Sequence, residues 1–497
     1  MLNNDSLLKI FRHYRLNHKN NWNLRYMWRI LAHICRRWRY LLYDSSSHLD
    51  MYLLLTKNSP SIGTLSHLPP LPLVIDYSDR TDTVARKVAG HIHLGLQQHG
   101  CVRRVLLQAS SLSLRIWLEP MNKLFPRLED LSLLSTTVEE TNLILPETFQ
   151  APDLRRLSLH GISLPKRLSL LSSPISLSSL SLTHIGASCY FPPGHLVKRL
   201  QGLPHLEELS IGFAIPIPLP SSEEQLLPAP IPPVRLPTLR WLTYRGVDAY
   251  LENFVAQINT PLLERLNLTF FFDLTFTLVN LTEFIHRTER FGCLAAQVNL
   301  NKDGASIDMG HYEHWDIGRL SLHVNCEPLD WQIDSATQVC IALGNVLSTV
   351  EELKLDLNTR DMLSDSSWEN TLDSLVWHEL LLPFIQVKKL YIGSSLAFEL
   401  SQALDTVAGG LVLELLPELQ RLGVQLEIND AKKAFSEFIR TRESVGRPVH
   451  LWALPISHAE PEGLPRYREQ AISLVSTYRT FIQAEEQTSR SRVELKM

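Results

Sequence analysis

The chain offers few groups of residues that could do chemistry. It has no glycine-rich phosphate loop, no His-Glu-x-x-His pair for zinc and no Gly-x-Ser-x-Gly nucleophile turn. The densest set of possible ligands is His311-Tyr-Glu313-His314-Trp-Asp316, in which imidazoles and carboxylates are residue types that bind zinc. Because this polar segment directly follows Gly310, a solvated turn is the favoured interpretation. The sequence therefore predicts no catalytic residue, metal or cofactor, and we expect a protein that is not an enzyme.

Composition and charge point to a folded chain with a distinct N-terminal part. The chain has 497 residues, of which 44% are hydrophobic and 20% charged, and its net charge is −4. Residues 1–45 carry nine Lys/Arg and two Asp/Glu, which leaves 39 basic and 50 acidic residues for the rest. This asymmetry predicts a separate N-terminal module. The near-neutral total favours neither nucleic acid nor membrane as a partner.

The cysteines and the apolar runs bear on the compartment. The six cysteines show no short pair spacing, so neither a zinc site nor a disulfide framework is expected. The first nine residues lack the apolar core of a signal peptide, and no run reaches the ~18–20 apolar residues of a membrane span. We therefore expect a soluble protein of the cytoplasm or nucleus.

One short pattern recurs along most of the chain: an apolar residue, two variable residues, an apolar residue, one variable residue and an apolar residue. In six copies a proline stands two residues ahead of it. The copies lie at 102–107, 128–133, 154–159, 177–182, 206–211, 239–244, 263–268, 295–300, 317–322, 350–355, 387–392 and 419–424. Their mean spacing is about 29 residues, at the long end of the range of leucine-rich repeats.

The pattern predicts a strand in each copy. Side chains alternate between the two faces of a strand, so Leu131 and Leu133 point inward and Ser132 points outward. A single copy cannot bury its leucines, but stacked copies can. A chance pattern in a leucine-rich chain would explain one copy and not twelve. We expect an α/β fold: an irregular leucine-rich-repeat solenoid shaped as a horseshoe, with parallel strands on the concave face and helix or coil returning outside.

Four segments follow from these patterns. Residues 1–45 form the helical module, 46–100 a linker and the N-terminal cap of the solenoid, 101–455 the solenoid, and 456–497 a charged C-terminal tail. Within the solenoid, 214–237 is rich in proline and reads as a surface loop, because proline is excluded from helix interiors and central strands. A ligand for a proline-binding domain is the alternative interpretation of that loop.

The N-terminal module reads as two helices. Asn3, Asn4, Asp5 and Ser6 are possible N-cap residues before a first amphipathic helix. A second helix is expected over 25–43, where large apolar residues recur every three or four positions. Two short helices cannot hold a core alone, so they need a partner surface.

These residues carry a resemblance. The sequence Asp5-x-x-Leu8-x-Ile10-Phe11, followed after a gap by Trp28-x-x-Leu31-x-His33-x-Cys35-Arg36-Arg37-Trp38-Arg39, resembles the F-box of mushroom-type fungal proteins. The stretches 46–54 and 70–75 resemble the segment that joins this F-box to its repeats. In place of the Leu-Pro opening that is usual in the family, this chain has Leu2-Asn3.

The resemblance implies a function. F-box proteins dock onto a Skp-family adaptor, and through it a cullin–RING (SCF-type) ubiquitin ligase, while a second domain captures the protein substrate. Carried over to this chain, the residues expected to contact the adaptor are Leu2, Leu8, Ile10, Phe11, Trp28, Leu31, Cys35 and Trp38.

The outward strand positions form the expected substrate surface. Aromatic residues that face solvent commonly anchor interfaces, and several basic residues share the same register. The residues expected to bind substrate are Arg156, Trp241, Arg245, Arg265, Arg319, Lys389, Tyr391 and Arg421. An acidic or phosphorylated partner is a hypothesis here, and basic side chains that merely solubilise the sheet are the alternative.

The sequence also allows a second function. The chain is alternatively a non-enzymatic leucine-rich-repeat scaffold whose N-terminal helices only cap the first repeats. The two hypotheses differ in where Trp28 and Trp38 lie, because a cap would bury them against the solenoid.

Overall fold

The computed structural model describes most of the chain. It describes residues 3–16, 27–45, 52–56, 71–78, 86–137, 143–165, 176–215, 233–271, 278–288, 291–301, 304–310, 319–326, 328–357, 374–405 and 415–454. The statements that follow concern these residues. The candidate metal ligands at 311–316, the tail from 456 and most of the proline-rich segment 214–237 lie outside them.

A large, mostly parallel sheet of sixteen strands runs through the described part of the chain, and a second sheet pairs only β8 (Val234–Arg235) with β10 (Ile258–Asn259). In their order across the sheet the strands are β1 (Leu53–Leu55), β2 (Leu73–Ser78), β3 (Val102–Ala109), β4 (Asp130–Ser135), β5 (Arg156–His160), β6 (Ser179–Ile185), β7 (Glu208–Phe213), β9 (Trp241–Gly246), β11 (Arg265–Phe271), β14 (Leu320–Asn325), β13 (Gly304–Gly310), β12 (Ala295–Asn301), β15 (Glu352–Leu357), β16 (Lys389–Ile392), β17 (Arg421–Val424) and β18 (His450–Ala453). All twelve copies of the apolar pattern form strands of this sheet.

The apolar positions of the pattern build the core. In β4, burial alternates strictly, with Leu131 and Leu133 buried and Asp130 and Ser132 partly exposed. Leu131 pairs in register with Leu157 of β5, so equivalent leucines stack from strand to strand. Burial of each leucine stabilises the fold by about 1.5–3 kcal/mol. An isolated strand could not gain this stabilisation, because it has no neighbour against which to bury its leucines.

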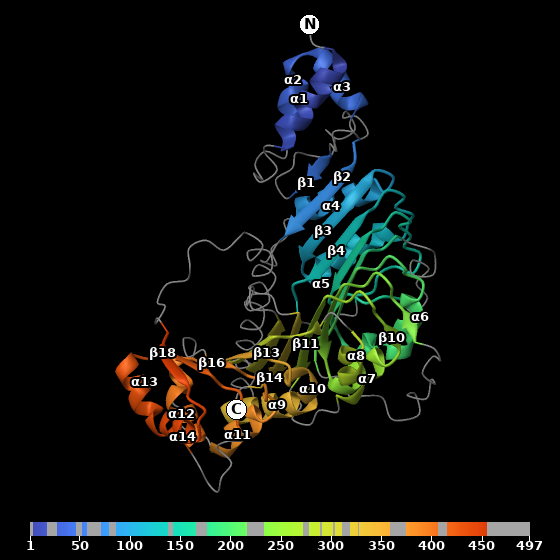
Figure 1. Cartoon of the computed structure of the whole chain (residues 1–497). Coiled ribbons are helices and arrows are strands. Elements are labelled where there is room, and N and C mark those ends of the chain that lie inside the picture. Colours follow the sequence, from blue (N-terminus) through green and yellow to red (C-terminus); the bar gives the residue numbers. More distant parts are fainter. Residues whose placement is uncertain are drawn as a thin grey trace, which may run out of the picture.

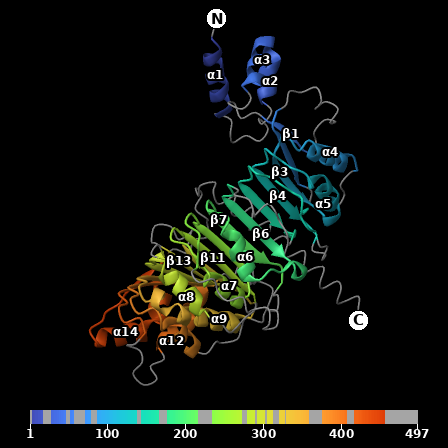
Figure 2. The ribbon, with the colours of Figure 1, turned by 90° about the vertical axis from the view of Figure 1, so that its right-hand side faces the viewer.

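The helices from α4 onward lie on one side of the sheet (Figures 1 and 2), and the opposite face, here the open face, carries the outward strand positions. Figure 1 shows the sheet curving from β1 at the top through β11 to β18, with α6 to α12 along its outer side. The helices are α1 (Asn4–Leu16), α2 (Met27–Ile34), α3 (Arg36–Asp44), α4 (Arg86–Gln97), α5 (Ser111–Leu118), α6 (Pro193–Leu200), α7 (Asp248–Val255), α8 (Val279–His286), α9 (Leu329–Ala342), α10 (Gly344–Leu347), α11 (Ser374–Leu381), α12 (Ala397–Asp405), α13 (Ile428–Ala434) and α14 (Ser436–Ser444). None of these helices is long and apolar enough to cross a membrane.

The expectation that every strand is parallel is wrong in the middle of the sheet. β13 is antiparallel to both of its neighbours, β12 and β14. The strand order therefore reverses, so that β14 lies beside β11 and β12 lies beside β15. β13 has the alternating burial of its neighbours but lacks the six-residue apolar pattern. Gly304 is the first residue of β13 and has φ 147°. A Cβ at this position would clash with the carbonyl oxygen of Val324 on β14, so the close approach of β13 and β14 requires glycine here.

The sheet also extends beyond the predicted repeats at both ends. β1, β2 and α4 fall in the segment 46–100 that was expected to be linker and cap, and β1 and β2 pair in parallel with each other and with β3. At the other end, β18 pairs with β17. In β18, the register aligns Leu451 and Ala453 with Leu422 and Val424, the last two apolar positions of the previous copy. Pro448 stands where the first apolar position would be, so the copy escapes detection.

The N-terminal module contains three helices instead of two. Asn3 begins α1, because its side-chain oxygen accepts the backbone N–H of Ser6 at 2.8 Å. The helix expected over 25–43 is divided at Cys35, whose backbone is extended. The Cys35 Sγ accepts the N–H of Trp38 at 3.4 Å and so acts as the N-cap of α3. The apolar spacing continues across this break, which is why the sequence pattern does not reveal it.

A buried arginine closes the C-terminal end of the sheet. The guanidinium of Arg442, on α14, is fully buried and donates to the carbonyl oxygens of Leu416, Pro417 and Leu419 at 3.3, 3.3 and 3.1 Å. These carbonyls precede β17, and Leu416 has a left-handed backbone with φ 47°. Arg442 therefore holds the turn that leads into the penultimate strand.

Removal of this side chain is predicted to loosen the C-terminal strands. Arg442→Met keeps most of the apolar volume but removes the guanidinium donor from three carbonyl oxygens. Leu416 keeps the N–H of Leu419 and Pro417 keeps the guanidinium of Arg447 as donors, so we expect a cost of about 1–3 kcal/mol in unfolding free energy. Urea unfolding followed by tryptophan fluorescence measures it. Arg440→Met on the same helix is the control, because Arg440 is exposed and, among the residues that the structure describes, pairs with Glu437. Equal midpoints for the two variants would contradict the assignment.

Candidate interaction surface

Three rows of side chains cross the open face. Parallel pairing in register places one residue of each strand beside its equivalent in the next. The first row runs through Arg104, Asp130, Arg156, Ser179, Glu208, Trp241 and Arg265. The second runs through Leu106, Ser132, Ser158, Ser181, Ser210, Thr243 and Asn267, and the third begins with Gln108, Leu134, His160 and Thr183. The predicted substrate residues Arg156, Trp241, Arg265, Lys389 and Arg421 share the first row or its continuation.

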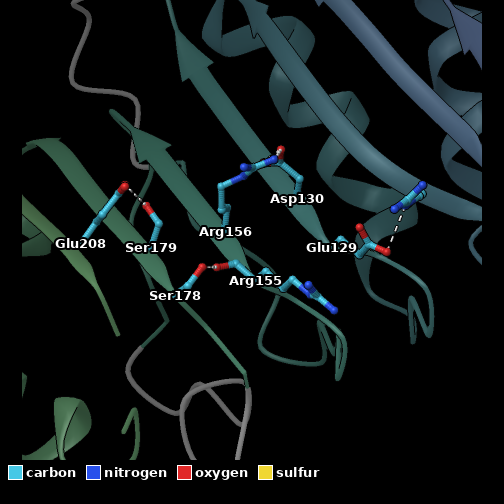
Figure 3. Close-up of polar contacts among 8 residues, drawn as sticks. Glu129, Asp130, Arg155, Arg156, Ser178, Ser179 and Glu208 are labelled. Atoms are coloured by element: carbon cyan, nitrogen blue, oxygen red, sulfur yellow. Dashed lines mark hydrogen bonds and ion pairs between the residues drawn. The ribbon is translucent and has the colours of Figure 1, made fainter. Parts of the chain in front are cut away.

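Polar contacts bridge neighbouring strands along the first row (Figure 3). The Arg156 guanidinium donates to the Asp130 carboxylate at 2.7 Å, and the Ser179 hydroxyl donates to Glu208 at 3.0 Å. One position earlier on the strands, Arg103 pairs with Glu129 at 3.0 Å. Because these groups are partly exposed, each ion pair adds only about 0–1 kcal/mol, but together they align the row.

These ion pairs change the expected charge of the face. Arg156 pairs with Asp130, and Lys389 pairs with Glu352 on the neighbouring strand. Lys354 in turn pairs with Asp356 at 3.3 Å. The expected locally basic face therefore includes two members, Arg156 and Lys389, whose charge is paired with a carboxylate. Arg265 and Arg319 stand directly before paired residues of the neighbouring strands β11 and β14, whereas Arg245 and Arg421 lie elsewhere on the face.

Trp241 lies in the middle of the first row. Its side chain is 42% exposed, and the guanidinium of Arg265 lies over the indole ring, 5.4 Å from its centroid. On its other side is Glu208 of β7. A large ring held in place by a cation–π contact, with much of its surface still in water, has the properties of an interface anchor.

Tyr391 lies nearer the C-terminal end, in an aromatic pair that the sequence did not reveal. Its ring meets that of Trp452 edge-on at 5.6 Å. Gly423 lies between their strands, and a Cβ there would come within 2.8 Å of the indole and 3.2 Å of the tyrosine ring. The absent side chain lets the two rings meet, so Tyr391 is half-buried by Trp452.

The third row contains a group of imidazoles that sequence analysis missed. The rings of His160 on β5 and His184 on β6 stack 5.1 Å apart at 21°. His160 also shares a hydrogen bond with the Thr183 hydroxyl at 3.0 Å. Burial, and then the charges of His184 and Arg245, lower the pKa of His160 to about 4. Burial, and then the charge of Arg245, also lower the pKa of His184. No spacing signal identifies this group, since an irregularity of β6 creates it.

The N-terminal helices enclose a small aromatic core. Phe11 of α1 is 2% exposed and meets Trp38 of α3 edge-on at 4.9 Å. Leu7, Ala32 and Leu42 are also buried there. Figures 1 and 2 show the three helices projecting from the β1 end of the sheet.

The predicted adaptor residues do not form one exposed stripe. Phe11 is inside the module, Trp38, Leu8 and Leu31 are half-buried, and Ile10 and Cys35 are exposed. Leu2 and the Trp28 side chain lie outside the described residues. The expectation of surface contact is therefore corrected for Phe11, whose ring is needed between the helices. Two exposed apolar residues were missed: Ile34 at 55% and Tyr40 at 75%, beside the predicted Ile10 at 46%.

Comparison with known proteins adds no further identification: no protein-family model matches the chain, and no curated protein matches it closely enough to count as a relative. Within the described ranges, no three His, Cys, Asp or Glu side chains are grouped as metal ligands.

The buried imidazole of His160 predicts a pH dependence of stability. In the unfolded chain it takes up a proton near its ordinary pKa of 6.5, whereas in the folded chain it does so only near pH 4. The unfolded state therefore binds more protons between these values, and stability falls as the pH falls. We expect His160→Gln to remove about 2–3 kcal/mol of the loss seen between pH 7.5 and 4.5.

Urea unfolding at several pH values measures this difference. His195→Gln on α6, which makes the same substitution at an exposed position, is the control variant. If wild type and His160→Gln lost equal stability as the pH falls, His160 would have the same pKa in the folded and unfolded chains, and the prediction would be wrong.

Proposed function

We propose that this chain is the substrate-recognition subunit of a cullin–RING (SCF-type) ubiquitin ligase. In this role the N-terminal helices act as an F-box that binds a Skp-family adaptor and, through it, a cullin. The remaining strands and helices act as a leucine-rich-repeat solenoid whose open face binds a protein substrate. The chain itself performs no chemistry, takes no cofactor and works in the cytoplasm or nucleus.

The observation that carries the proposal is the form of the N-terminal module. The small helical unit, in which Phe11 packs against Trp38, presents three exposed apolar side chains, Ile10, Ile34 and Tyr40. Large apolar side chains in water cost free energy, and their concentration on so small a module is typical of a docking surface. The F-box resemblance of residues 2–39 supplies the kind of partner.

The open face supports the second half of the proposal. Its strands present polar, ion-paired side chains around the exposed Trp241, which resembles a protein interface more than a small-molecule site. A curved array of repeats offers an extended surface of this kind, and binding through it needs no catalytic group.

The scaffold hypothesis predicts a different environment for the N-terminal helices. A cap would bury Trp38 against the first strands, whereas its ring packs on Phe11 within the helical module. The exposed Ile10, Ile34 and Tyr40 would then have no partner. These observations favour the receptor hypothesis.

Adaptor binding is predicted to depend on the exposed residues of the module. We expect the full chain to bind a purified fungal Skp-family adaptor, and Ile34→Asp or Tyr40→Ala to weaken binding by about tenfold or more, since each removes apolar contact area. Surface plasmon resonance measures the affinity. Unlike Phe11 or Trp38, these residues can change without loss of the module's core.

Leu112→Asp is the matched control, because Leu112 is an equally exposed apolar residue on α5, outside the module. It should bind the adaptor like wild type. A wild-type chain that is folded but does not bind would leave the scaffold hypothesis in place.

Substrate capture is predicted to depend on Trp241. Trp241→Ala removes the proposed anchor, and we expect the proteins that copurify with the chain to be depleted by about tenfold or more. Trp331→Ala, which removes a similarly exposed indole from α9 on the helical side, should leave them unchanged. Quantitative mass spectrometry of the copurified proteins measures both. Equal depletion by the two variants would exclude a special role for Trp241.

A further inference from the structure

A partly buried carboxylate lies on the open face where β13 runs between β12 and β14. Asp308 of β13 is paired in register with Gln297 of β12 on one side and with Ser321 of β14 on the other. The adjacent pair of β12 and β13 consists of Asn299 and Ser306. All five residues alternate with buried apolar residues, so their side chains belong to the open face. The antiparallel strand thus sets one carboxylate among uncharged polar groups.

The two carboxylate oxygens of Asp308 are hydrogen-bonded unequally. Its Oδ1 accepts the hydroxyl of Ser321 at 2.5 Å. Its Oδ2 has the hydroxyl of Ser306 and the amide of Asn299 as donors, each at 3.4 Å. Hydrogen bonds to an oxygen are usually about 2.7–3.2 Å long. Among the described residues, Oδ2 therefore has no close donor.

No guanidinium or ammonium group of the described residues neutralises Asp308. Burial raises the pKa of its carboxyl group, and the charge in the described part of the chain that opposes this rise is that of His323. Lys354, two strands away on the same row, pairs with Asp356 at 3.3 Å. Taking a carboxylate out of water costs free energy unless a cation compensates it. A cation from a bound partner would recover that free energy.

Gln297 adds a second acceptor beside the carboxylate. Its Nε2 donates to the Oδ1 of Asn299 at 2.5 Å, which orients the amide and leaves Oε1 without a donor among the described residues. Gln297 and Asp308 lie directly opposite each other, and the Cβ atoms of such pairs are about 4.5–5.5 Å apart. One planar donor group can therefore reach both the Gln297 Oε1 and the Asp308 Oδ2.

We propose that Asp308 and Gln297 bind the guanidinium of an arginine side chain on the partner protein. A guanidinium is planar and carries several N–H donors in a fixed fork, so it can donate to the carboxylate and the amide oxygen at once. An ammonium is a compact point charge that is more strongly hydrated, so a lysine fits less well. That a protein carries the arginine rests on the proposed function; the guanidinium site itself does not.

The position of the site suits a partner that is anchored at Trp241. The strands β9 and β13 are three strand spacings apart in the sheet, which is about 14 Å. An extended segment covers this distance in about four residues. A partner that covers the Trp241 ring would therefore bring residues close to that contact onto Asp308.

Saturation-transfer NMR titration of the full chain at neutral pH tests the proposal. The probes are N-acetyl-arginine amide, N-acetyl-lysine amide, the uncharged N-acetyl-citrulline amide and free arginine. We expect the blocked arginine to bind with millimolar affinity, the lysine probe to bind more weakly and the citrulline probe not to bind. Asp308→Asn keeps the shape of the side chain and should weaken arginine binding by about tenfold or more. Gln297→Met, which keeps the carboxylate, should weaken it by about threefold.

Asp130→Asn is the matched control, since it removes a carboxylate of the same face that is already paired with Arg156. It should bind the blocked arginine like wild type. Absence of saturable binding to the folded wild type, or equal weakening by Asp308→Asn and Asp130→Asn, would overturn the site.

The other probes test the kind of ligand. Equal binding of the lysine or the citrulline probe would overturn the guanidinium assignment. Tighter binding of free arginine than of the blocked form would overturn the protein-borne source. Adaptor binding on the same preparation tests the receptor role separately.

Discussion

The stacking of leucines between parallel strands is the interaction on which the rest of the structure depends. A strand such as β5 buries two apolar side chains, Leu157 and Leu159, only because equivalent residues lie on the strands beside it. No repeat is stable alone, so the register of the whole sheet follows from this one contact. The same register places every intervening side chain on the open face. The surface that we propose for binding is therefore a by-product of the core.

The sequence predicts this core well because its signal is local. Three apolar positions in six residues identify all twelve strands that carry the pattern. The sequence does not predict features that depend on long-range strand pairing or on a local change of backbone conformation. β13 joins the sheet by antiparallel pairing, which no pattern in its own residues predicts. Cys35 interrupts a helix at a point where the spacing of apolar residues continues unbroken. The helical module was recognised from its sequence, but not which of its residues are exposed.

The candidate site shows the same division. The register placed Trp241 and Arg156 on the open face correctly, since only alternation was needed. It could not show that Arg156 meets Asp130 on the neighbouring strand, because pairing across strands depends on distances between repeats. His184 was missed because a bulge reverses its direction. The features most relevant to specificity therefore arise where the repeat departs from regularity.

These departures give the open face local differences in chemistry. Along the first row, basic and acidic side chains largely compensate one another. On the third row, by contrast, the imidazoles of His160 and His184 stack on each other and are largely buried. A partner that crosses the sheet would meet an aromatic anchor at Trp241 and, on the same strand, the side chain of Arg245. Such a surface can discriminate among partners by both shape and charge.

The central claim is that the helical module is a docking unit while the open face serves another partner. Hydrogen–deuterium exchange of the full chain, with and without a purified Skp-family adaptor, tests it most directly. The account predicts that exchange slows in α1, α2 and α3 and stays unchanged along β4 to β11. Unchanged exchange in the three helices, or protection of the open face instead, would contradict it.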